Sequence, residues 1–378
     1  MPLLAKLPRL SGRFAGEIAS ENLRSLERFA RLNIIATPTP LTSCHPRLPV
    51  HRPHVLSHCV PFGTHDVGTM IYTLTLNPAL DRELTVPAFA FDQVLRASSV
   101  RVDYGGKGFN VSRALAALGA ESIALGFVGG ATGESLTVGL ADLGIRTDFV
   151  QVAGETRTNV SIVTEDRAHY LKVNDPGPMI THAEQTALLR KTRALAQPGD
   201  WWVLAGSLPP GVPATFYAEV IRLVQSAGAH AVLDTSGEPL RVGCTARPFL
   251  VKPNATEVSE LAGTRVTSLD EARSAIGKIH TLGVHNVVIS LGRVGALYSD
   301  GQNIWQAEPP EVDECNPIGA GDAVVAGLVW ALSRDYGGSE ALRWGVACGA
   351  AAASLDGTAM GPRSLVETLA WQVRIVSD

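Results

Sequence analysis

The sequence predicts an α/β fold: a three-layer α/β/α sandwich with a mostly parallel central sheet, and a small second sheet that protrudes from it. From Met70 onward, short apolar segments alternate with amphipathic helical segments. The apolar segments are hydrophobic on both faces, which is typical of parallel strands covered by helices on both sides. Glu83–Asp103 and Thr158–Val173 interrupt this alternation, because they have strand patterns with no helix between the strands. We expect these two segments to form the small sheet.

The periodicity gives the elements of the sandwich in order along the chain. The expected strands are Ile71–Leu76, Ile123–Val128, Trp201–Leu204, Ala231–Asp234, Leu250–Val251 and Val287–Ser290. The expected helices are Val111–Leu118, Glu134–Leu143, Pro213–Ser226, Leu269–Leu282, Ala323–Ser333 and Ser339–Ser354. Many of these helices are followed by glycine, the residue that helix C-termini prefer.

The composition excludes several classes of protein. Hydrophobic residues make up 46% of the chain and charged residues 18%, which is enough apolar material for a large core. A net charge of -4 argues against a nucleic-acid-binding protein, which normally has a basic face. No apolar run reaches the roughly 18 residues that a membrane-spanning helix needs. The five cysteines are widely spaced and form no CxxC pair, so we expect no disulfides, no zinc site and a location in the reducing cytoplasm.

The first 69 residues differ from the rest of the chain. They are rich in Pro, Arg and His and show no sustained periodicity. Met70 opens the alternating segment MIYTLTLNPALD, which suggests that translation begins there. We therefore expect residues 1–69 to be a disordered extension or to be untranslated; a transit peptide is the alternative, because the first sixteen residues contain Arg and Ser but no acid. Residues 70–378 are expected to form one domain, with the small sheet at about 83–104 and 157–173.

The strongest motif is Asn316–Asp322, with the sequence NPIGAGD, which leads into an apolar helical segment. Gly319 and Gly321 allow a sharp turn and a close approach of the backbone to a ligand. The start of the following helix presents unpaired N–H groups and the positive end of its dipole, which together form an anion site. Asp322 would repel a bound phosphate, but it suits a base that accepts a proton from a hydroxyl attacking that phosphate. A helix cap after a glycine turn is the alternative.

Two further motifs suit a small polar ligand. Gly105–Gly108, with the sequence GGKG, precedes a helix and would let a ligand lie against the backbone while Lys107 meets an anion. It does not match the P-loop pattern. Asp81 follows the first strand, at the sheet edge where ligands bind in open α/β folds, and its carboxylate suits paired sugar hydroxyls. An ordinary turn with a solvated lysine or aspartate is the alternative for each.

The segment Lys252–Glu257, with the sequence KPNATE, leads from a strand into a helix. Asn254 and Glu257 are spaced to lie on one face of that helix, where an amide and a carboxylate suit hydrated Mg²⁺. A capping box made by the same two side chains is the alternative, and the two interpretations are compatible.

Three shorter segments add polar groups. Ser290–Gly295, with the sequence SLGRVG, ends a strand and can accommodate a nucleotide. Gly206–Gly211, with the sequence GSLPPG, offers the hydroxyl of Ser207 and backbone N–H groups. Arg157 suits bidentate contact with a phosphate. Each of these patterns is common, so none identifies a site by itself.

Taken together and in this order, the motifs resemble those of ribokinase-like sugar kinases of the phosphofructokinase B type. They are most similar to the branch that contains 1-phosphofructokinase and tagatose-6-phosphate kinase. The resemblance runs from about Met70 to near the C-terminus and includes the GAGD segment Gly319–Asp322 and the GGKG segment. It implies the ribokinase-like fold, ATP as co-substrate and Mg²⁺ as cofactor. It also implies a homodimer formed through the small sheet, which would act as a lid over a sugar phosphate.

The resemblance implies a role for each candidate residue. Asp322 would be the catalytic base, with the backbone of Gly319, Ala320 and Gly321 as the anion hole. The sugar would contact Asp81, Gly105, Gly106 and Asn110. Its existing phosphate would contact Lys107, Arg157 and Ser207, and Arg96 would reach the phosphate of a neighbouring subunit. ATP would contact Lys252, Asn254, Glu257, Ser290, Gly292 and Gly295, and Glu257 and Asn254 would hold Mg²⁺ through water.

The lysine of the GGKG loop favours fructose 1-phosphate as the substrate. In the minor 6-phosphofructokinases of the family this loop is typically all glycine and a lysine of the lid binds the phosphate, whereas Asp92–Arg96 contains no lysine. Tagatose 6-phosphate fits the same pattern. Arg343–Ala353 resembles the minor 6-phosphofructokinases, so fructose 6-phosphate is also an alternative. A kinase of an unphosphorylated sugar and a non-catalytic sugar-phosphate sensor are the remaining ones.

Overall fold

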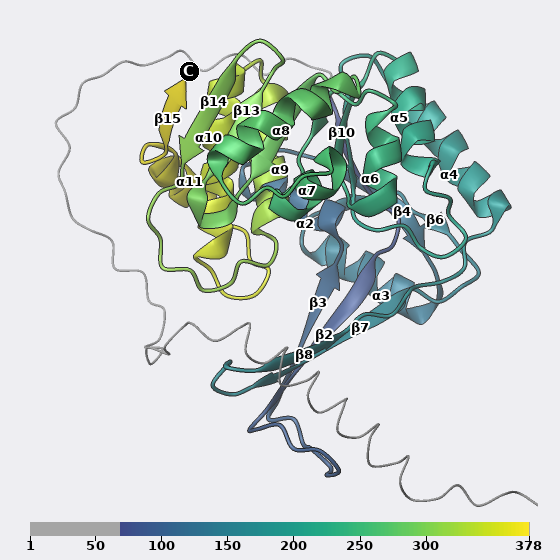
Figure 1. Cartoon of the computed structure of the whole chain (residues 1–378). Helices are drawn as coiled ribbons and strands as arrows, with labels where there is room; N and C mark the ends of the chain where they lie inside the picture. Colours follow the sequence, from purple (N-terminus) through teal and green to yellow (C-terminus); the bar gives the residue numbers. More distant parts are fainter. Residues whose placement is uncertain (1–68, 378) are drawn as a thin grey trace, which may run out of the picture. The chain divides into compact units, whose positions relative to one another are not determined.

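The computed structural model describes residues 69–377 (Figure 1). Our expectation of an untranslated or disordered extension, or of a transit peptide, concerns residues that lie outside this range, apart from Thr69. Within the range, no helix is long and apolar enough to cross a membrane. The predicted α/β fold is confirmed, with a large, mostly parallel sheet and a smaller separate one.

The large sheet has eleven strands in the order β15-β14-β13-β12-β11-β10-β9-β1-β4-β5, with β6 also paired to β4. In the order of the sheet, all strands from β12 through β1 to β4 are parallel, and β5 and β6 both pair with β4 in parallel. The hairpin β13–β14 and the strand β15 add an antiparallel edge next to β12. The strands are β1 (Ile71–Thr75), β4 (Ile123–Val128), β5 (Arg146–Thr147), β6 (Val150–Gln151), β9 (Trp201–Ala205), β10 (His230–Asp234), β11 (Leu250–Val251), β12 (Asn286–Ser290), β13 (Ala296–Ser299), β14 (Ile304–Glu308) and β15 (Arg374–Ser377).

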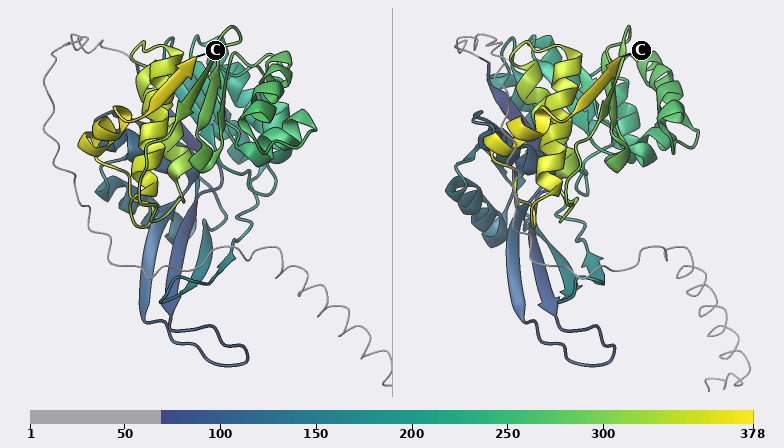
Figure 2. Two further views of the ribbon diagram at one scale, coloured as in Figure 1. Left: turned by 60° about the vertical axis from the view of Figure 1, so that its left-hand side comes forward. Right: turned by 90° about the vertical axis from the view of Figure 1, so that its left-hand side faces the viewer.

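Helices cover both faces of this sheet (Figures 1 and 2). Alternation along a single strand divides the core, since Trp202 and Leu204 pack on one side and Trp201 and Val203 on the other. The first side holds α4 (His182–Leu195), α5 (Phe216–Ser226), α6 (Gly237–Cys244), α7 (Ala255–Ala262) and α8 (Leu269–Thr281). The second holds α2 (Lys107–Ala117), α9 (Ala320–Leu332), α10 (Gly338–Ala353) and α11 (Arg363–Ala370), while α3 (Gly130–Asp142) packs against β4 and α2.

The small sheet extends away from the sandwich in both further views (Figure 2). Its strand order is β3-β2-β7-β8, with β2 (Ala79–Val86), β3 (Ser99–Gly105), β7 (Arg157–Thr164) and β8 (Tyr170–Val173). Residues directly opposite each other on paired strands share a face. Leu84 lies opposite Val100 and Ile162, so one face is apolar. Asp81 lies opposite Asp103 and Asn159, so the other face is polar.

The boundaries differ from expectation in two places that affect the site. Residues 87–98 form a loop where we expected strand, because Pro87 at its start cannot donate a hydrogen bond to a neighbouring strand. Helix α9 starts at Ala320 and is capped by Gly319 in the left-handed conformation, with φ of 84°. Asp322 is therefore inside the first turn of α9, and the interpretation of Asp322 as the helix cap is wrong.

Candidate active site

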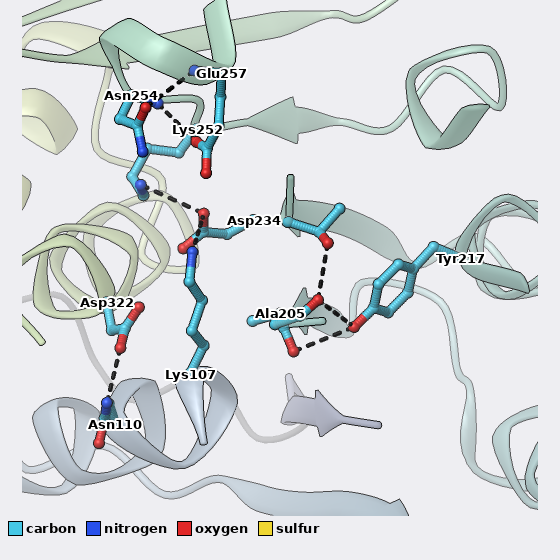
Figure 3. A network of polar contacts seen from close by, with 11 residues as sticks. Lys107, Asn110, Ala205, Tyr217, Asp234, Lys252, Asn254, Glu257 and Asp322 are labelled. Carbon is cyan, nitrogen blue, oxygen red and sulfur yellow. Dashed lines mark hydrogen bonds and ion pairs between the residues drawn. The ribbon is translucent and has the colours of Figure 1, made fainter. Parts of the chain in front are cut away.

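The Asp322 carboxylate lies in the first turn of α9 and is buried, with 6% of the residue exposed. Its Oδ2 accepts a hydrogen bond of 2.8 Å from Nδ2 of Asn110 in α2 (Figure 3). Burial raises the pKa of Asp322 to about 6, and the charge of Asp234 acts in the same direction. Lys107 and Lys252 oppose this shift, as does the hydrogen bond from Asn110. The result is a carboxylate that can accept a proton near neutral pH.

The turn before α9 brings backbone and a lysine to the same place. A Cβ built on Gly321 would lie 3.7 Å from Nζ of Lys252, so the ammonium faces this turn closely. Asn316 fixes the turn at its other end, because its Oδ1 accepts from the N–H of Ile318 and its Nδ2 donates to the carbonyl of Gly357. The N–H of Ala320 donates to Pro317 at 3.2 Å. The unpaired N–H groups of a first helical turn and the nearby ammonium suit a phosphoryl group.

A buried aspartate joins two lysines beside Asp322. Oδ1 of Asp234, at the end of β10, lies 3.2 Å from Nζ of Lys107 and 3.4 Å from Nζ of Lys252 (Figure 3). Burial by itself would lower the pKa of Lys107, but the negative charges around it, chiefly Asp234 and then Asp322, raise it. Both acidic side chains therefore help to keep Lys107 positively charged.

The GGKG loop is packed closely onto β1, which explains its glycines. A Cβ on Gly106, where φ is 154°, would lie 2.8 Å from Cγ2 of Thr75, and one on Gly108 would lie 2.5 Å from its Oγ1. A Cβ on Gly105 would lie 2.2 Å from Oδ2 of Asp81. Oδ1 of Asp81 accepts a hydrogen bond of 2.7 Å from Nδ2 of Asn159. Gly105 therefore leaves the space that the Asp81 carboxylate occupies.

Arg157 and Ser207 line an open pocket of about 610 Å³ between the small sheet and the loop after β9. The guanidinium of Arg157 donates to the carbonyls of Asn77 and Asp175 at 2.9 and 2.8 Å, which fixes its direction. A planar guanidinium held in this way suits a phosphate. Lys107, which we expected at the same phosphate, extends to Asp234 here.

The nucleotide segments meet at the ends of β11 and β12. Asn254 and Glu257 form the capping box of α7, with Oδ1 of Asn254 accepting two backbone N–H groups and Oε2 of Glu257 accepting one. The backbone of Asn254 also forms an isolated parallel β-bridge with the backbone of Ser290. Gly292 and Gly295 both have positive φ in the turn that follows, and a Cβ on Gly295 would lie 2.1 Å from the carbonyl of Ala307.

Most predicted site residues converge, and Arg96 lies apart from them. Arg96 is exposed in the loop between β2 and β3, at a distance along the small sheet from the residues at its base. Across residues 69–377, no group of three His, Cys, Asp or Glu side chains could enclose a metal ion.

Sequence reasoning missed Asp234 and Asn159. Asp234 is the last residue of a predicted strand, and the same rule that singled out Asp81, an acid at the carboxyl end of a parallel strand, applies to it. Asn159 lies within β7 and carried no signal, because its contact with Asp81 depends on the pairing of β2 with β7.

Comparisons with known proteins agree with this geometry. Residues 70–363 match the model of the family described as pfkB family carbohydrate kinase. The chain is 38% identical over 306 residues to a 1-phosphofructokinase of Bacillus subtilis, covering 81% of this chain and 99% of that protein. It is 33% identical over 306 residues to a 1-phosphofructokinase of Vibrio cholerae, covering 81% of this chain and 96% of that protein.

A solved structure is similar over the same region. The phosphofructokinase-2 of Escherichia coli in complex with fructose-6-phosphate superimposes with a TM-score of 0.75 at 33% identity, covering 80% of this chain and 99% of that one.

Proposed function

Because this chain belongs to the pfkB family of carbohydrate kinases, which use ATP, we propose that it phosphorylates fructose 1-phosphate to fructose 1,6-bisphosphate. The similarity to two 1-phosphofructokinases over nearly their whole length carries this proposal. The arrangement of the buried Asp322, the glycine turn before it and the two lysines beside it supports the chemistry.

Asp322 acts as the general base in this proposal. It accepts the proton of the free primary hydroxyl of the sugar phosphate as that oxygen attacks the γ-phosphorus of ATP. The bond from the γ-phosphorus to the bridging oxygen breaks, and ADP leaves. The backbone of Gly319 and Gly321, at the positive end of α9, stabilises the charge on the transferring phosphoryl group, whereas the N–H of Ala320 already donates to the carbonyl of Pro317. The hydrogen bond from Asn110 orients the carboxylate for this task.

The sugar phosphate lies between the GGKG loop and the small sheet. Asp81, Gly106 and Asn110 contact its hydroxyls, and Gly105 provides the space for Asp81. Arg157 and Ser207 bind its existing phosphate in the pocket that they line. Lys107 stays paired with Asp234 and adds positive charge near this phosphate.

ATP lies along Lys252, Asn254, Glu257 and the turn that contains Ser290, Gly292 and Gly295. Oδ1 of Asn254 and Oε2 of Glu257 are already used in the helix cap, so these residues fit contact with Mg²⁺ through water better than direct ligation. When bound, Mg²⁺ would neutralise charge on the ATP phosphate oxygens.

The small sheet serves as a lid and as the contact between two subunits in a homodimer. Its apolar face carries Val100, Val102, Leu171 and Val173, which are 45% to 59% exposed in the single chain. A second copy is the simplest cover for such a face. In the dimer, Arg96 of one loop reaches toward the phosphate site of its neighbour. A cytoplasmic location, expected from the cysteine pattern, completes the proposal.

Fructose 6-phosphate is the second candidate substrate, because the E. coli phosphofructokinase-2 that resembles this chain was solved with it. The test is ADP release with Mg²⁺ and ATP, comparing kcat/KM for fructose 1-phosphate, fructose 6-phosphate, tagatose 6-phosphate and fructose. We expect the highest value for fructose 1-phosphate. A higher value for another phosphate would change the substrate, and the highest value for fructose would remove the phosphate-binding role of Arg157 and Ser207. Sugar-phosphate binding without turnover would identify a sensor.

A further inference from the structure

Asp234 is placed to control the lysines of two different binding segments. Lys107 comes from the GGKG loop on the sugar side, and Lys252 comes from the segment after β11 on the ATP side. Both ammonium groups lie within 3.4 Å of one oxygen, Oδ1 of Asp234 (Figure 3). The aspartate side chain is completely buried and that of Lys252 is 4% exposed. Asp234 is therefore the only described side chain that pairs with both lysines.

The second carboxylate oxygen of Asp234 argues against a purely structural role for its ion pairs with the two lysines. Oδ2 of Asp234 is buried and has no hydrogen-bond partner among the described residues. Buried carboxylate oxygens are rarely left unpaired in folded proteins, because each carries a desolvation cost. Burying an ion pair stabilises a fold weakly at best. A buried carboxylate oxygen without a partner needs a reason, and a role in catalysis is one.

The transfer reaction gives a reason for this arrangement. Lysine carries its charge on a flexible four-carbon chain, so an unrestrained ammonium spends little time at one point. Catalysis by charge requires that the charge is in place before the reaction. Oδ1 of Asp234 holds Lys252 beside the turn at Gly321 and holds Lys107 near Asp322.

We propose that Asp234 is a positioning residue for phosphoryl transfer, whose carboxylate holds the ammonium groups of Lys107 and Lys252 at the two sides of the transferred group. This inference rests on the proposed function, in which the turn before Asp322 binds that group. Asp234 contacts neither substrate in this account and acts through the two lysines.

The test is a double-mutant cycle between Asp234→Asn and Lys252→Met, with fructose 1-phosphate and ATP. Asp234→Asn keeps the shape of the side chain and removes its charge. We expect kcat to fall about 30-fold, with KM for fructose 1-phosphate changed by less than about 3-fold, because the lost interaction matters mainly in the transition state. In the Lys252→Met background, the same change should cost less than about 5-fold, since one of its two targets is already absent. Losses that multiply fully would overturn the proposal.

Two further variants separate positioning from stability. Asp200 is another buried aspartate, which accepts from the N–H groups of Met70 and Gln197 at the opposite end of β9. Asp200→Asn should lower Tm and leave kcat unchanged. Asp234→Glu keeps the charge but displaces both ammonium groups, so kcat should fall at least about 5-fold in a folded protein. Full kcat in Asp234→Glu and in Asp234→Asn would show that the aspartate is only structural.

The cycle also distinguishes this inference from the proposed function. If the unaltered protein turns over fructose 1-phosphate and Asp322→Asn does not, the proposed function stands. Normal kcat in Asp234→Asn would then contradict the positioning role alone. If the unaltered protein releases no ADP with any sugar phosphate, both proposals fail together.

Discussion

Asn110 and Asp322 are joined by a hydrogen bond of 2.8 Å between helices that lie far apart in the sequence. Both side chains are buried, with 8% and 6% of the residues exposed. The amide of Asn110 donates to Oδ2 of the carboxylate. α2 therefore orients the base that α9 carries, and the GGKG loop at the start of α2 is held in the same unit.

Removing this hydrogen bond should impair the reaction more than the fold. In Asn110→Ala we expect kcat to fall about 10- to 100-fold because the base loses its orientation, and KM for the sugar phosphate to rise because Asn110 also contacts the sugar. Steady-state kinetics measure both. Asn286→Ala is the control, since Asn286 is a similarly buried amide at the start of β12 that bonds Tyr298 and Phe249. A kcat loss of the same size in the control would contradict the assignment.

The rate should depend on pH through Asp322. Its pKa is raised to about 6 by burial, with Asp234 adding to the shift and Lys107 and Lys252 opposing it. A base must be deprotonated, so kcat should be constant at pH 7 to 8 and fall tenfold per unit well below pH 6. The phosphate of the sugar also titrates near pH 6, which can change how well the substrate binds. We therefore measure kcat at saturating substrate, where a change in binding has no effect. Asn110→Ala removes a hydrogen bond that lowers the pKa of Asp322, so the fall in kcat should begin at a higher pH in this variant. If kcat depended on pH in the same way in both proteins, the fall in kcat could not be assigned to Asp322.

The absence of a side chain at Gly105 should matter for sugar binding. A Cβ there would lie 2.2 Å from Oδ2 of Asp81, so Gly105→Ala displaces that carboxylate. We expect KM for fructose 1-phosphate to rise about 10-fold and KM for ATP to stay within about 2-fold. Gly277→Ala in α8 is the matched control, because a Cβ there meets nothing within 4 Å. Equal changes in both KM values would show that the loop does not act on the sugar specifically.

The apolar face of the small sheet should determine the oligomeric state. Leu171→Lys places a charge on that face, where the residue is 54% exposed. Light scattering after size-exclusion chromatography should give two chains for the unaltered protein and one chain of 39.9 kDa for the variant. Val138→Lys, at a 56% exposed position of α3, should leave the dimer intact. A monomeric unaltered protein would exclude the dimer.

Local patterns in the sequence predicted much of the sandwich. Strands β4 and β11 have the predicted bounds, and the capping box at Asn254 was foreseen from spacing alone. The helices α4, α6 and α11, the short strands β5 and β6, and the antiparallel edge β13–β15 were not predicted. Helix α4 is mainly polar, and β14 and β15 are partly exposed, so none of them has the strong apolar period that marks buried elements. β13 is buried but only four residues long, which is too short to show a period.

The sequence predicted those parts of the candidate site in which all the residues belong to one continuous motif. The turn before Asp322 and the GGKG loop are of this kind. Contacts between motifs were not predictable, because they depend on strand order: Asp234 meets Lys107 and Lys252 only because β10 lies between β9 and β11. No local pattern reveals Asp234 as the partner of Lys107.

The Asp322→Asn variant needs a check on folding, and the pKa gives its expected sign. The folded-state pKa of Asp322 is raised from 3.8 to about 6, so the ionised carboxylate costs stability above pH 6 and this cost disappears below about pH 4. The variant should therefore have a Tm at pH 8 at least equal to that of the unaltered protein. The difference should shrink as the pH falls toward 4.

The most direct test of the account is kcat of the Asp322→Asn variant with saturating fructose 1-phosphate and Mg²⁺-ATP at pH 8. The account predicts a fall of about three orders of magnitude, with the Kd of ATP from calorimetry within about 3-fold of the unaltered value. Turnover within about 10-fold of the unaltered protein would contradict the assignment of Asp322 as the base.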